Sequence, residues 1–313
     1  MRCCGGSFYD WDPALDGEML MASFYDRMAE NRRNSYILIV FVFAVCMAAV
    51  WGASLLFLGD SPLGFALGAL FSGGYVAVTY FAADRMILSV SGAREARKEE
   101  YPHLVNVVEG LSIAAGVSVP KIYVIDDPAP NAFAVGTSPE KASVAFTTGL
   151  LSMMSRAEIE GVAAHELSHI KNFDSRMATI AVAMVGLIAI LSDLGLRSMF
   201  WGGRGGGRGR GGGSGGLALI GLLIIILAPI VSQLVRLALS RQREFLADAS
   251  GAELTRFPEG LASALEKMKK SGTMVQKATD ATASLYFANP LSMGGLFSTH
   301  PPLDERIKRL KEM

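Results

Sequence analysis

Two histidines one helical turn apart are the residues of this chain best suited to chemistry. They lie in the segment HELSH, where His165 and His169 flank Glu166. Side chains four residues apart share one face of a helix, so two neutral imidazoles at this spacing can bind one zinc ion. A glutamate beside the first histidine can take a proton from an attacking water and pass it to a leaving amine. The pattern therefore predicts a zinc site that hydrolyses peptide bonds.

A five-residue pattern also occurs by chance, so a helix with two surface histidines is the alternative. Two features favour the metal site. The chain has four histidines, and two of them fall in this segment. Ser155 and Glu158 are spaced as a capping box, which predicts a helix that begins there and runs through HELSH. His103, which follows Tyr101 and Pro102 near a predicted helix start, is assigned a structural role.

A distant carboxylate is the candidate third ligand, because catalytic zinc takes three protein ligands and keeps one position open. Glu244 lies in RQREFLAD, with Asp248 four residues on and on the same helix face. Glu244 could bind zinc while Asp248 orients a ligating imidazole through its second ring nitrogen. On spacing alone, an ordinary helix with solvated carboxylates remains an alternative. Asn172 and Asp174 are expected to end the HELSH helix, with a place for Asp174 near the zinc as the other interpretation.

The composition indicates a membrane protein with a soluble part. Hydrophobic residues make up 51% of the chain, the mean hydropathy is +0.35, and 29 basic residues balance 29 acidic ones. Because a balanced chain has no broad basic field, nucleic acid is not an expected partner. Residues 36–58 and 63–83 contain no charged side chain, and each is long enough to cross a bilayer as a helix. They predict a transmembrane hairpin.

A second apolar pair, residues 177–196 and 217–239, flanks a linker rich in glycine and arginine at 202–216. Basic residues cluster before the first span and after the second, so the positive-inside rule places the N-terminus and residues 84–176 in the cytoplasm. We expect four spans, with a re-entrant or interfacial second hairpin as the alternative because of the linker arginines. Either topology returns the HELSH segment and Glu244 to the same side of the membrane.

The remaining elements frame the HELSH helix. Helical spacing of charges and apolar residues predicts an amphipathic helix over 92–116, and short apolar runs predict strands at 121–125, 132–135 and 143–148. The fold class is mainly α: a helical integral membrane protein with a zincin-like cytoplasmic metalloprotease domain that carries a small β-sheet. The predicted divisions are a cytoplasmic N-terminal segment (1–34), a transmembrane helical hairpin (36–83), a first protease part with HELSH (84–176), a second hydrophobic hairpin (177–239) and a second protease part with the third zinc ligand (240–313).

Together with further motifs, these residues resemble the HtpX-type membrane metalloproteases, which are relatives of the CAAX prenyl proteases. The resemblance covers most of the chain and follows, in order, FYDRMAENRR (24–33), IYVIDDPAPNAFAVG (122–136), TTGLL (147–151), HELSH, REFLAD (243–248) and STHPPLDERI (298–307). Residues 1–22 depart from it as an extension of unassigned role. The resemblance implies one Zn²⁺ per subunit on His165, His169 and Glu244, with Glu166 as catalytic acid and base. It implies that Asp248 contacts a metal-binding side chain and does not bind the metal itself.

The resemblance also places Asn131, His300 and Arg306 at the active site. Asn131 starts a predicted edge strand, where its amide could hold a substrate backbone that pairs by strand addition. His300 or Arg306 could stabilise the oxyanion of the tetrahedral intermediate. The alternatives are structural, because Asn131 follows a proline and could be a turn residue, and His300 before Pro301 and Pro302 could end a loop.

The expected function is that of a zinc endopeptidase in the cell membrane, multi-pass and with its catalytic domain in the cytoplasm. It would act on membrane proteins or unfolded polypeptides, in quality control and the stress response. A prenyl-protein-type protease and a catalytically silent membrane scaffold or chaperone are the alternatives, and the intact HELSH segment with Glu244 argues against the scaffold. The charges around HELSH do not suit an intramembrane protease. The sequence predicts no particular oligomeric state.

Overall fold

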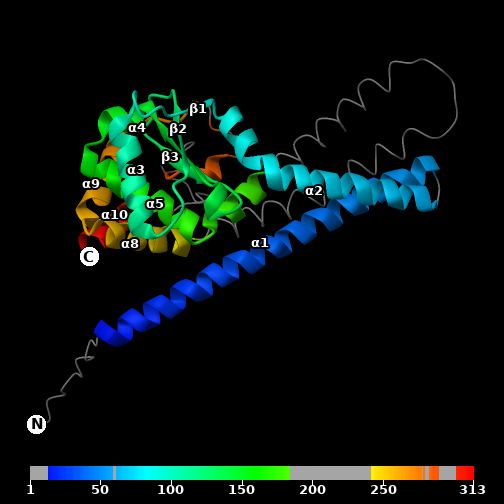
Figure 1. Ribbon diagram of the computed structural model, residues 1–313, viewed down its shortest axis with the longest axis horizontal. Coiled ribbons are helices and arrows are strands. Elements are labelled where there is room, and N and C mark those ends of the chain that lie inside the picture. Colours follow the sequence, from blue (N-terminus) through cyan, green and yellow to red (C-terminus); the bar gives the residue numbers. More distant parts are fainter. Residues whose placement is uncertain (1–12, 59–60, 184–240, 277, 279–281, 289–300) are drawn as a thin grey trace, which may run out of the picture.

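The computed structural model describes residues 13–58, 61–183, 241–276, 278, 282–288 and 301–313. Helices packed around a small sheet form a body, and two long helices reach away from it (Figure 1). The α-helices are α1 (Pro13–Leu58), α2 (Pro62–Val90), α3 (Pro102–Ala115), α4 (Thr148–Met153), α5 (Arg156–Lys171), α8 (Arg241–Thr255), α9 (Pro258–Ser271) and α10 (Leu303–Lys311). The strands are β1 (Ala93–Glu95), β2 (Lys121–Ile125), β3 (Ala132–Val135) and β4 (Ser143–Thr147), and two short 3₁₀ helices are η1 (Pro139–Lys141) and η2 (Ala283–Leu285).

Helices α1 and α2 form the predicted helical hairpin, which projects from the body (Figure 1). They approach closely where glycines of α2 face α1, and a Cβ on Gly64 would lie 2.2 Å from the Ser54 hydroxyl. Small residues allow such close approach between helices in lipid. Met28–Gly52 and Pro62–Val90 are long and apolar enough to cross a membrane, and among the described residues they are the two helices of that kind.

Both helices extend beyond the predicted spans. Helix α1 already begins at Pro13, so the polar residues before the first span belong to the same helix. Helix α2 continues to Val90, so the predicted boundary at residue 84 lies inside a helix. The physical reason is that no proline interrupts either helix after its first residue, and charged residues such as Arg and Glu are good helix formers.

Most of the second predicted hairpin, with its glycine- and arginine-rich linker, lies outside the described residues. Its start is described, and residues 174–183 are helical. These residues pack against α1 in a hydrophobic cluster made of Met177, Ile180, Ala181, Leu38, Val42 and Cys46. The chain that follows the HELSH helix therefore contacts α1.

The sheet has the strand order β1-β2-β4-β3, with β2 and β4 parallel and the other pairs antiparallel. The predicted strands at 121–125 and 132–135 are confirmed with these bounds. The third ends at Thr147, because the Thr147 side chain accepts a hydrogen bond from Leu150 and caps α4. The predicted mainly helical fold with a small sheet is confirmed, whereas the cytoplasmic, zincin-like character of the body stays a prediction.

The predicted helix over 92–116 is wrong in its first half. Residues 93–95 form β1, which pairs with β2 so that Ala93 lies opposite Ile125. Helix α3 begins only at Pro102, a residue that fits the first turn, where its missing N–H has no intrahelical partner. Pairing with a distant strand therefore overrode the local helical pattern.

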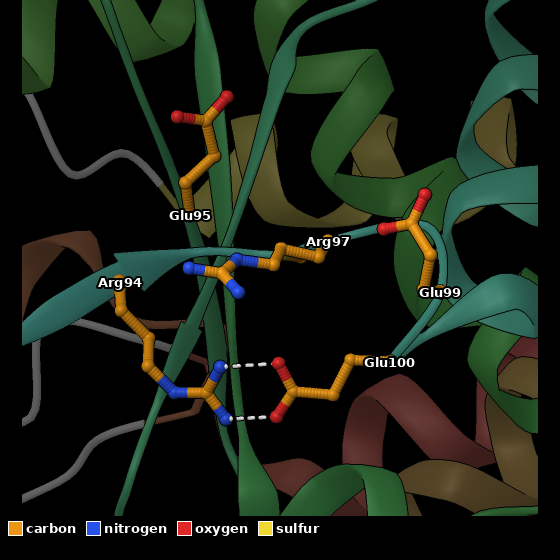
Figure 2. A pocket seen from close by; sticks show the side chains of 6 residues that line it. Arg94, Glu95, Arg97, Glu99 and Glu100 are labelled. Carbon is orange, nitrogen blue, oxygen red and sulfur yellow. Dashed lines mark hydrogen bonds and ion pairs between the residues drawn. The ribbon is translucent and has the colours of Figure 1, made fainter.

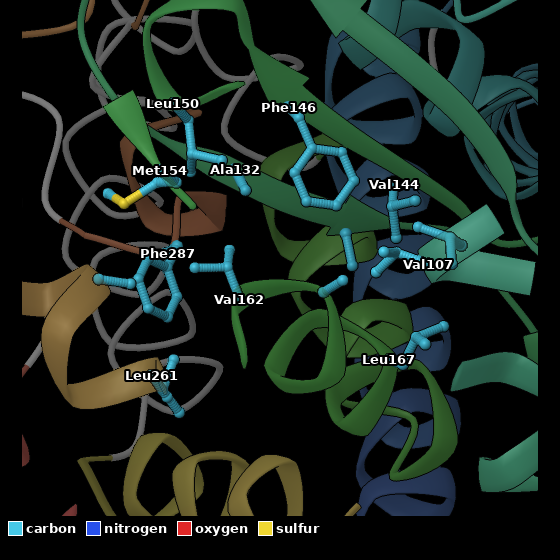
Figure 3. Close-up of a cluster of buried hydrophobic side chains, with 14 of the residues drawn as sticks. Val107, Ala132, Val144, Phe146, Leu150, Met154, Val162, Leu167, Leu261 and Phe287 are labelled. Atoms are coloured by element: carbon cyan, nitrogen blue, oxygen red, sulfur yellow. The ribbon is translucent and has the colours of Figure 1, made fainter. Parts of the chain in front are cut away.

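Hydrophobic clusters cover both faces of the sheet. On one face Phe146 packs with side chains of α3, α5 and α9, among them Val107, Leu167 and Leu261 (Figure 3). On the other face Phe133 joins a second cluster that includes residues at the end of α2. All residues of β3 and β4 are buried, and each fully buried Leu or Phe stabilises the fold by about 1.5–3 kcal/mol. The sheet thus holds α5 in a fixed place.

Candidate metal centre

Helix α5 begins with the predicted capping box. The Ser155 side chain accepts a hydrogen bond from the backbone of Glu158, and the Glu158 carboxylate accepts one from the backbone of Ser155. Lys267 of α9 donates to the same carboxylate at 2.7 Å, so the cap also joins α5 to α9. Further along, a Cβ on Gly161 would lie 2.8 Å from the backbone nitrogen of Leu261. These contacts set the rotation of α5, and hence the direction in which HELSH faces.

Helix α8 crosses α5 at the HELSH segment. A Cβ on Gly251 would lie 3.0 Å from the His165 backbone nitrogen, so a larger side chain would push the helices apart. The crossing brings Glu244 to the two histidines. The Nε2 atoms of His165 and His169 lie 3.1 Å apart, and oxygens of Glu244 lie 3.7 Å from the first and 3.6 Å from the second. The three ligand atoms all lie within 4.8 Å of one another.

This set of donors fits zinc. At Zn–N distances of about 2.0–2.1 Å, tetrahedral ligand atoms lie roughly 3.3–3.4 Å apart, which is close to the separations given above. Two imidazoles and one carboxylate are also a ligand set of catalytic zinc. In addition, Oε1 of Glu166 is buried and has no hydrogen-bond partner among the described residues. A buried carboxylate oxygen needs a polar partner, and the water of a catalytic metal site would supply one.

The other ring nitrogen of each histidine is held by a carboxylate. Nδ1 of His165 lies 2.9 Å from Oδ1 of Asp248, and Nδ1 of His169 lies 3.2 Å from Oδ2 of Asp174. A carboxylate that accepts the Nδ1 proton leaves Nε2 free to bind a metal. Asp248 therefore lies where its spacing from Glu244 suggested. For Asp174, both interpretations fit the structure, because α5 ends at Lys171 with Asn172 as its C-cap and the Asp174 carboxylate faces His169.

Burial and charge act differently on the two histidines. Full burial lowers the pKa of His165 to about 4. Burial opposes protonation of His169 too, but the hydrogen bond with Asp174 and the charge of Glu244 outweigh it and raise the pKa to about 9. The carboxylates around His169 thus favour a positive charge, which a bound metal ion also provides.

Glu166 is a further buried carboxylate of α5, next to His165 in the chain. It is 1% exposed, and burial raises its pKa to about 8, with Glu244 adding to this shift and His169 and Arg306 opposing it. A carboxyl group whose pKa is close to neutrality can both accept and release a proton. The role of Glu166 as general acid and base stays a prediction, with which this pKa is compatible.

Arg306 lies at the site, where it contacts protein groups. It is fully buried, and its Nε and Nη2 donate to the two oxygens of Asp248 at 2.8 and 2.7 Å. Its Nη1 donates to the Phe287 carbonyl at 2.9 Å and lies 3.3 Å from Oε2 of Glu244. These contacts make Arg306 a residue that positions Asp248, and through it His165. Its role in stabilising an oxyanion stays a prediction.

Asn131 lies beside β3 at the edge of the sheet, where its amide is occupied. Its Nδ2 donates to the Ala288 carbonyl at 2.9 Å, and its Oδ1 accepts from the Ala288 N–H at 3.2 Å. The Phe287 N–H donates to the Ala132 carbonyl at 2.8 Å, so residues 286–288 pair with the outer edge of β3. A substrate strand could pair here only after residues 286–288 had left. The predicted substrate contact of Asn131 therefore stays a prediction.

His103 does not belong to the cluster of candidate metal ligands. His103 is exposed at the start of α3. His300 lies outside the described residues, so its role at the active site stays a prediction. A charged surface pocket contains none of the metal donors among its lining residues. In it Arg94 donates two hydrogen bonds to Glu100 at 2.8 and 2.6 Å (Figure 2). Its lining residues are Arg94, Glu95, Ala96, Arg97, Glu99 and Glu100. Exposed ion pairs of this kind contribute little to stability.

Asn31 of α1 also reaches the metal centre, a contact that the sequence did not predict. Its Nδ2 donates to Oδ1 of Asp174 at 2.8 Å, and Asp174 is the carboxylate that faces His169. Asn31 and Asp174 are 143 residues apart. Because spacing rules reach only a few residues along a helix, no local pattern could have indicated this contact.

The chain matches a protein family and is similar to several known proteins. The model of peptidase family M48 matches residues 98–313. The chain is 49% identical to a protease HtpX homolog of Dictyoglomus thermophilum over 297 residues, which are 93% of this chain and 95% of the relative. It is 43% identical to a protease HtpX homolog of Streptococcus gordonii over 297 residues, 92% of this chain and 99% of the relative. Among solved structures, S. mikatae Ste24p is similar at 18% identity and a TM-score of 0.46, over 86% of this chain and 65% of that chain.

Proposed function

Because this chain belongs to peptidase family M48 and is therefore a protease, we propose that it is a membrane-bound zinc endopeptidase with its catalytic residues on α5 and α8. The observation that carries the proposal is the convergence of His165, His169 and Glu244 ligand atoms within 4.8 Å. Glu166 lies next to the first of them in the chain. The high identity to protease relatives over nearly the whole chain supports the proposal.

His165, His169 and Glu244 would hold one zinc ion per subunit. When bound, the ion would polarise the scissile carbonyl and lower the pKa of water. Asp248 and Asp174 accept the Nδ1 protons of the two histidines and so keep both Nε2 atoms directed toward one point. These two contacts therefore orient the proposed metal donors.

Glu166 is proposed as the general base and then the general acid. It takes a proton from the attacking water and delivers it to the leaving amine nitrogen, so the carboxylate is ionised again at the end of the reaction. Burial raises its pKa to about 8, which suits a group that accepts and donates a proton near neutral pH. A positioned acid–base residue typically contributes about 10²–10⁴-fold in rate.

The proposed substrates are membrane proteins or unfolded polypeptides, cleaved at the cytoplasmic face of the cell membrane as part of quality control. Apolar side chains face outward on the hairpin, with Val40 66% and Leu70 74% exposed, as is typical of a lipid-facing surface. Arg32 and Arg33 on α1 and Arg85 on α2 lie near the ends of the apolar spans that adjoin the body. By the positive-inside rule, that end and the body belong in the cytoplasm.

Replacing Glu166 with Gln tests this proposal in the full-length protein purified in detergent. Metal analysis should find zinc retained, because the three ligands are unchanged. Cleavage of an unfolded model protein should fall by at least about 10²-fold. Glu160→Gln on the same helix removes only an exposed ion pair with Arg156 and should cleave like the wild type. Undiminished cleavage by Glu166→Gln would reject the proposal.

The same preparation separates the alternative functions. A prenyl-protein-type protease would cleave a prenylated peptide and leave the unfolded protein intact. A membrane scaffold or chaperone would cleave neither substrate, with or without a chelator. A protease of the proposed kind cleaves the unfolded protein and loses this activity when a chelator removes the metal.

A further inference from the structure

The chain turns sharply between the HELSH helix and the helix that follows it. Asn172 caps the end of α5, and Phe173 has a φ of 61°, a left-handed conformation that is unusual for a bulky residue. Such a conformation persists where surrounding contacts hold it. The next residue, Asp174, carries the carboxylate that faces His169. The geometry of this turn therefore decides where that carboxylate lies.

Side chains of α1 contact this turn. Nδ2 of Asn31 donates to the Asn172 carbonyl at 2.9 Å and to Oδ1 of Asp174 at 2.8 Å, so both amide hydrogens are used. The guanidinium of Arg32 lies over the Phe173 ring, 5.5 Å from its centroid. Asn31 is 4% exposed, and hydrogen bonds shielded from water are electrostatically stronger. The first membrane helix thus contacts each of the three residues of the turn.

Asp174 extends this contact to the metal centre. Its Oδ1 is held by Asn31, and its Oδ2 lies 3.2 Å from Nδ1 of His169. The two oxygens belong to one planar carboxylate, so a bond that fixes Oδ1 also fixes the direction of Oδ2. Nε of Arg243 lies 3.5 Å from Oδ1, which is longer than an ordinary N–H···O hydrogen bond. Of these two contacts, Asn31 makes the shorter and more directional one.

From this geometry we propose that Asn31 is a positioning residue, which orients His169 for metal binding through Asp174. The inference rests on the zinc site proposed above, and it makes the N-terminal membrane helix a part of the catalytic unit as well as an anchor. Loss of a residue that supports a ligating histidine typically weakens metal binding about 10–100-fold. Asn31 is one contact further from the ligand than Asp174, so we expect a loss at the lower end of this range, about tenfold.

Zinc affinity of the full-length protein in detergent tests this proposal without relying on proteolysis. Competition with a chelator measures the affinity, and the absorption spectrum of the Co²⁺-substituted protein reports the ligand geometry. Asn31→Ala should weaken zinc binding about tenfold and alter the Co²⁺ spectrum. Ser35→Ala is the matched control, because Ser35 is fully buried on the same helix and its hydroxyl donates to the Asn31 carbonyl at 2.7 Å. This control should bind zinc like the wild type.

A double-mutant cycle decides whether Asn31 acts through Asp174. If it does, Asn31→Ala causes no further loss of zinc affinity in a protein that already carries Asp174→Ala. Independent, additive losses would overturn the proposal, and so would wild-type zinc affinity in Asn31→Ala, even if that variant unfolded at a lower temperature. If Asn31→Ala does not fold, Asn31→Leu replaces it, since it has a similar volume and no hydrogen-bond donor, and the same two outcomes decide.

The two proposals fail in different ways. Cleavage that persists in Glu166→Gln would reject the proposed catalytic mechanism. The zinc affinities of the Asn31 variants would still test the positioning role, because they do not depend on cleavage. Wild-type zinc affinity and a wild-type Co²⁺ spectrum in Asn31→Ala would reject the positioning role and leave the protease proposal intact.

Discussion

Replacing Arg306 with Ala is expected to destabilise the body strongly, because its guanidinium is the counter-charge of a buried carboxylate. Arg306 is 0% and Asp248 is 2% exposed, and two hydrogen bonds of 2.8 and 2.7 Å join them. Removing one partner of a buried pair costs about 3–5 kcal/mol. Leaving the Phe287 carbonyl without its donor costs about 1–3 kcal/mol more. The sum of about 4–8 kcal/mol is large beside a typical stability of about 5–15 kcal/mol.

Thermal unfolding of the metal-free, full-length protein in detergent measures this loss. For about 150–250 residues, 1 kcal/mol lowers Tm by roughly 2–4 °C, so Arg306→Ala should unfold at least about 8 °C below the wild type. The unfolding temperature of Arg306→Lys should lie between those of the wild type and Arg306→Ala, because a single ammonium keeps the charge and loses the two parallel hydrogen bonds. Lys308→Ala on the same helix is the control, since it removes an exposed contact of 3.8 Å with Glu312.

A joint replacement of Arg306 by Met and Asp248 by Leu separates stability from positioning. With both charges gone, most of the stability should return. Zinc binding should be weaker than in the wild type, because Nδ1 of His165 then has no carboxylate to hold it. If Arg306→Ala unfolded within about 2 °C of Lys308→Ala, the idea that this ion pair supports the fold would be refuted.

Two other outcomes follow from the same contacts. Asn131→Ala should destabilise the protein by about 1–3 kcal/mol in chemical denaturation, since the Ala288 N–H and carbonyl lose their partner. Unchanged stability together with lost cleavage would instead favour the predicted substrate contact. On acidification, the Asp248 carboxylate should contribute its stability fully above about pH 4 and lose it as the pH falls further. The reason is that burial favours the protonated acid, but the charge of Arg306 outweighs it and holds the pKa of Asp248 below its usual range. Acid unfolding that began well above pH 4 and was unaltered by Asp248→Asn would contradict this prediction.

Several elements could be predicted from the sequence because their signals are local. The capping box at Ser155 and Glu158 has both of its hydrogen bonds, and the strands Lys121–Ile125 and Ala132–Val135 have their expected bounds. The apolar spans form a hairpin as their length and composition indicated. Each of these signals is complete within a short stretch of chain, so no distant residue is needed to interpret it.

Where the predictions were wrong, a contact far along the chain or a missing stop signal was the cause. Residues 93–95 are a strand because they pair with β2, and a helical pattern in the local sequence does not reveal such a partner. Helix α1 runs from Pro13 through the charged residues into the apolar span, because a change from polar to apolar side chains does not end the backbone hydrogen bonding of a helix.

At the metal centre, the sequence by itself determined which side chains share a helix face. His165 and His169 are neighbours on α5, as Glu244 and Asp248 are on α8, because the α-helical repeat of 3.6 residues fixes these relations wherever a helix forms. Only the tertiary structure decided how the two helices meet. They cross closely where Gly251 of α8 lies against the His165 backbone.

The supporting residues were decided by tertiary structure alone. A turn at Phe173 brings Asp174 back to His169, and Asn31 reaches that carboxylate from a different helix. Arg306 becomes the buried counter-charge of Asp248 only when α10 packs against α8. These relations depend on burial and packing between distant segments, where a charge or amide must find a partner once water is excluded, and a pattern along the chain does not specify which partner that is.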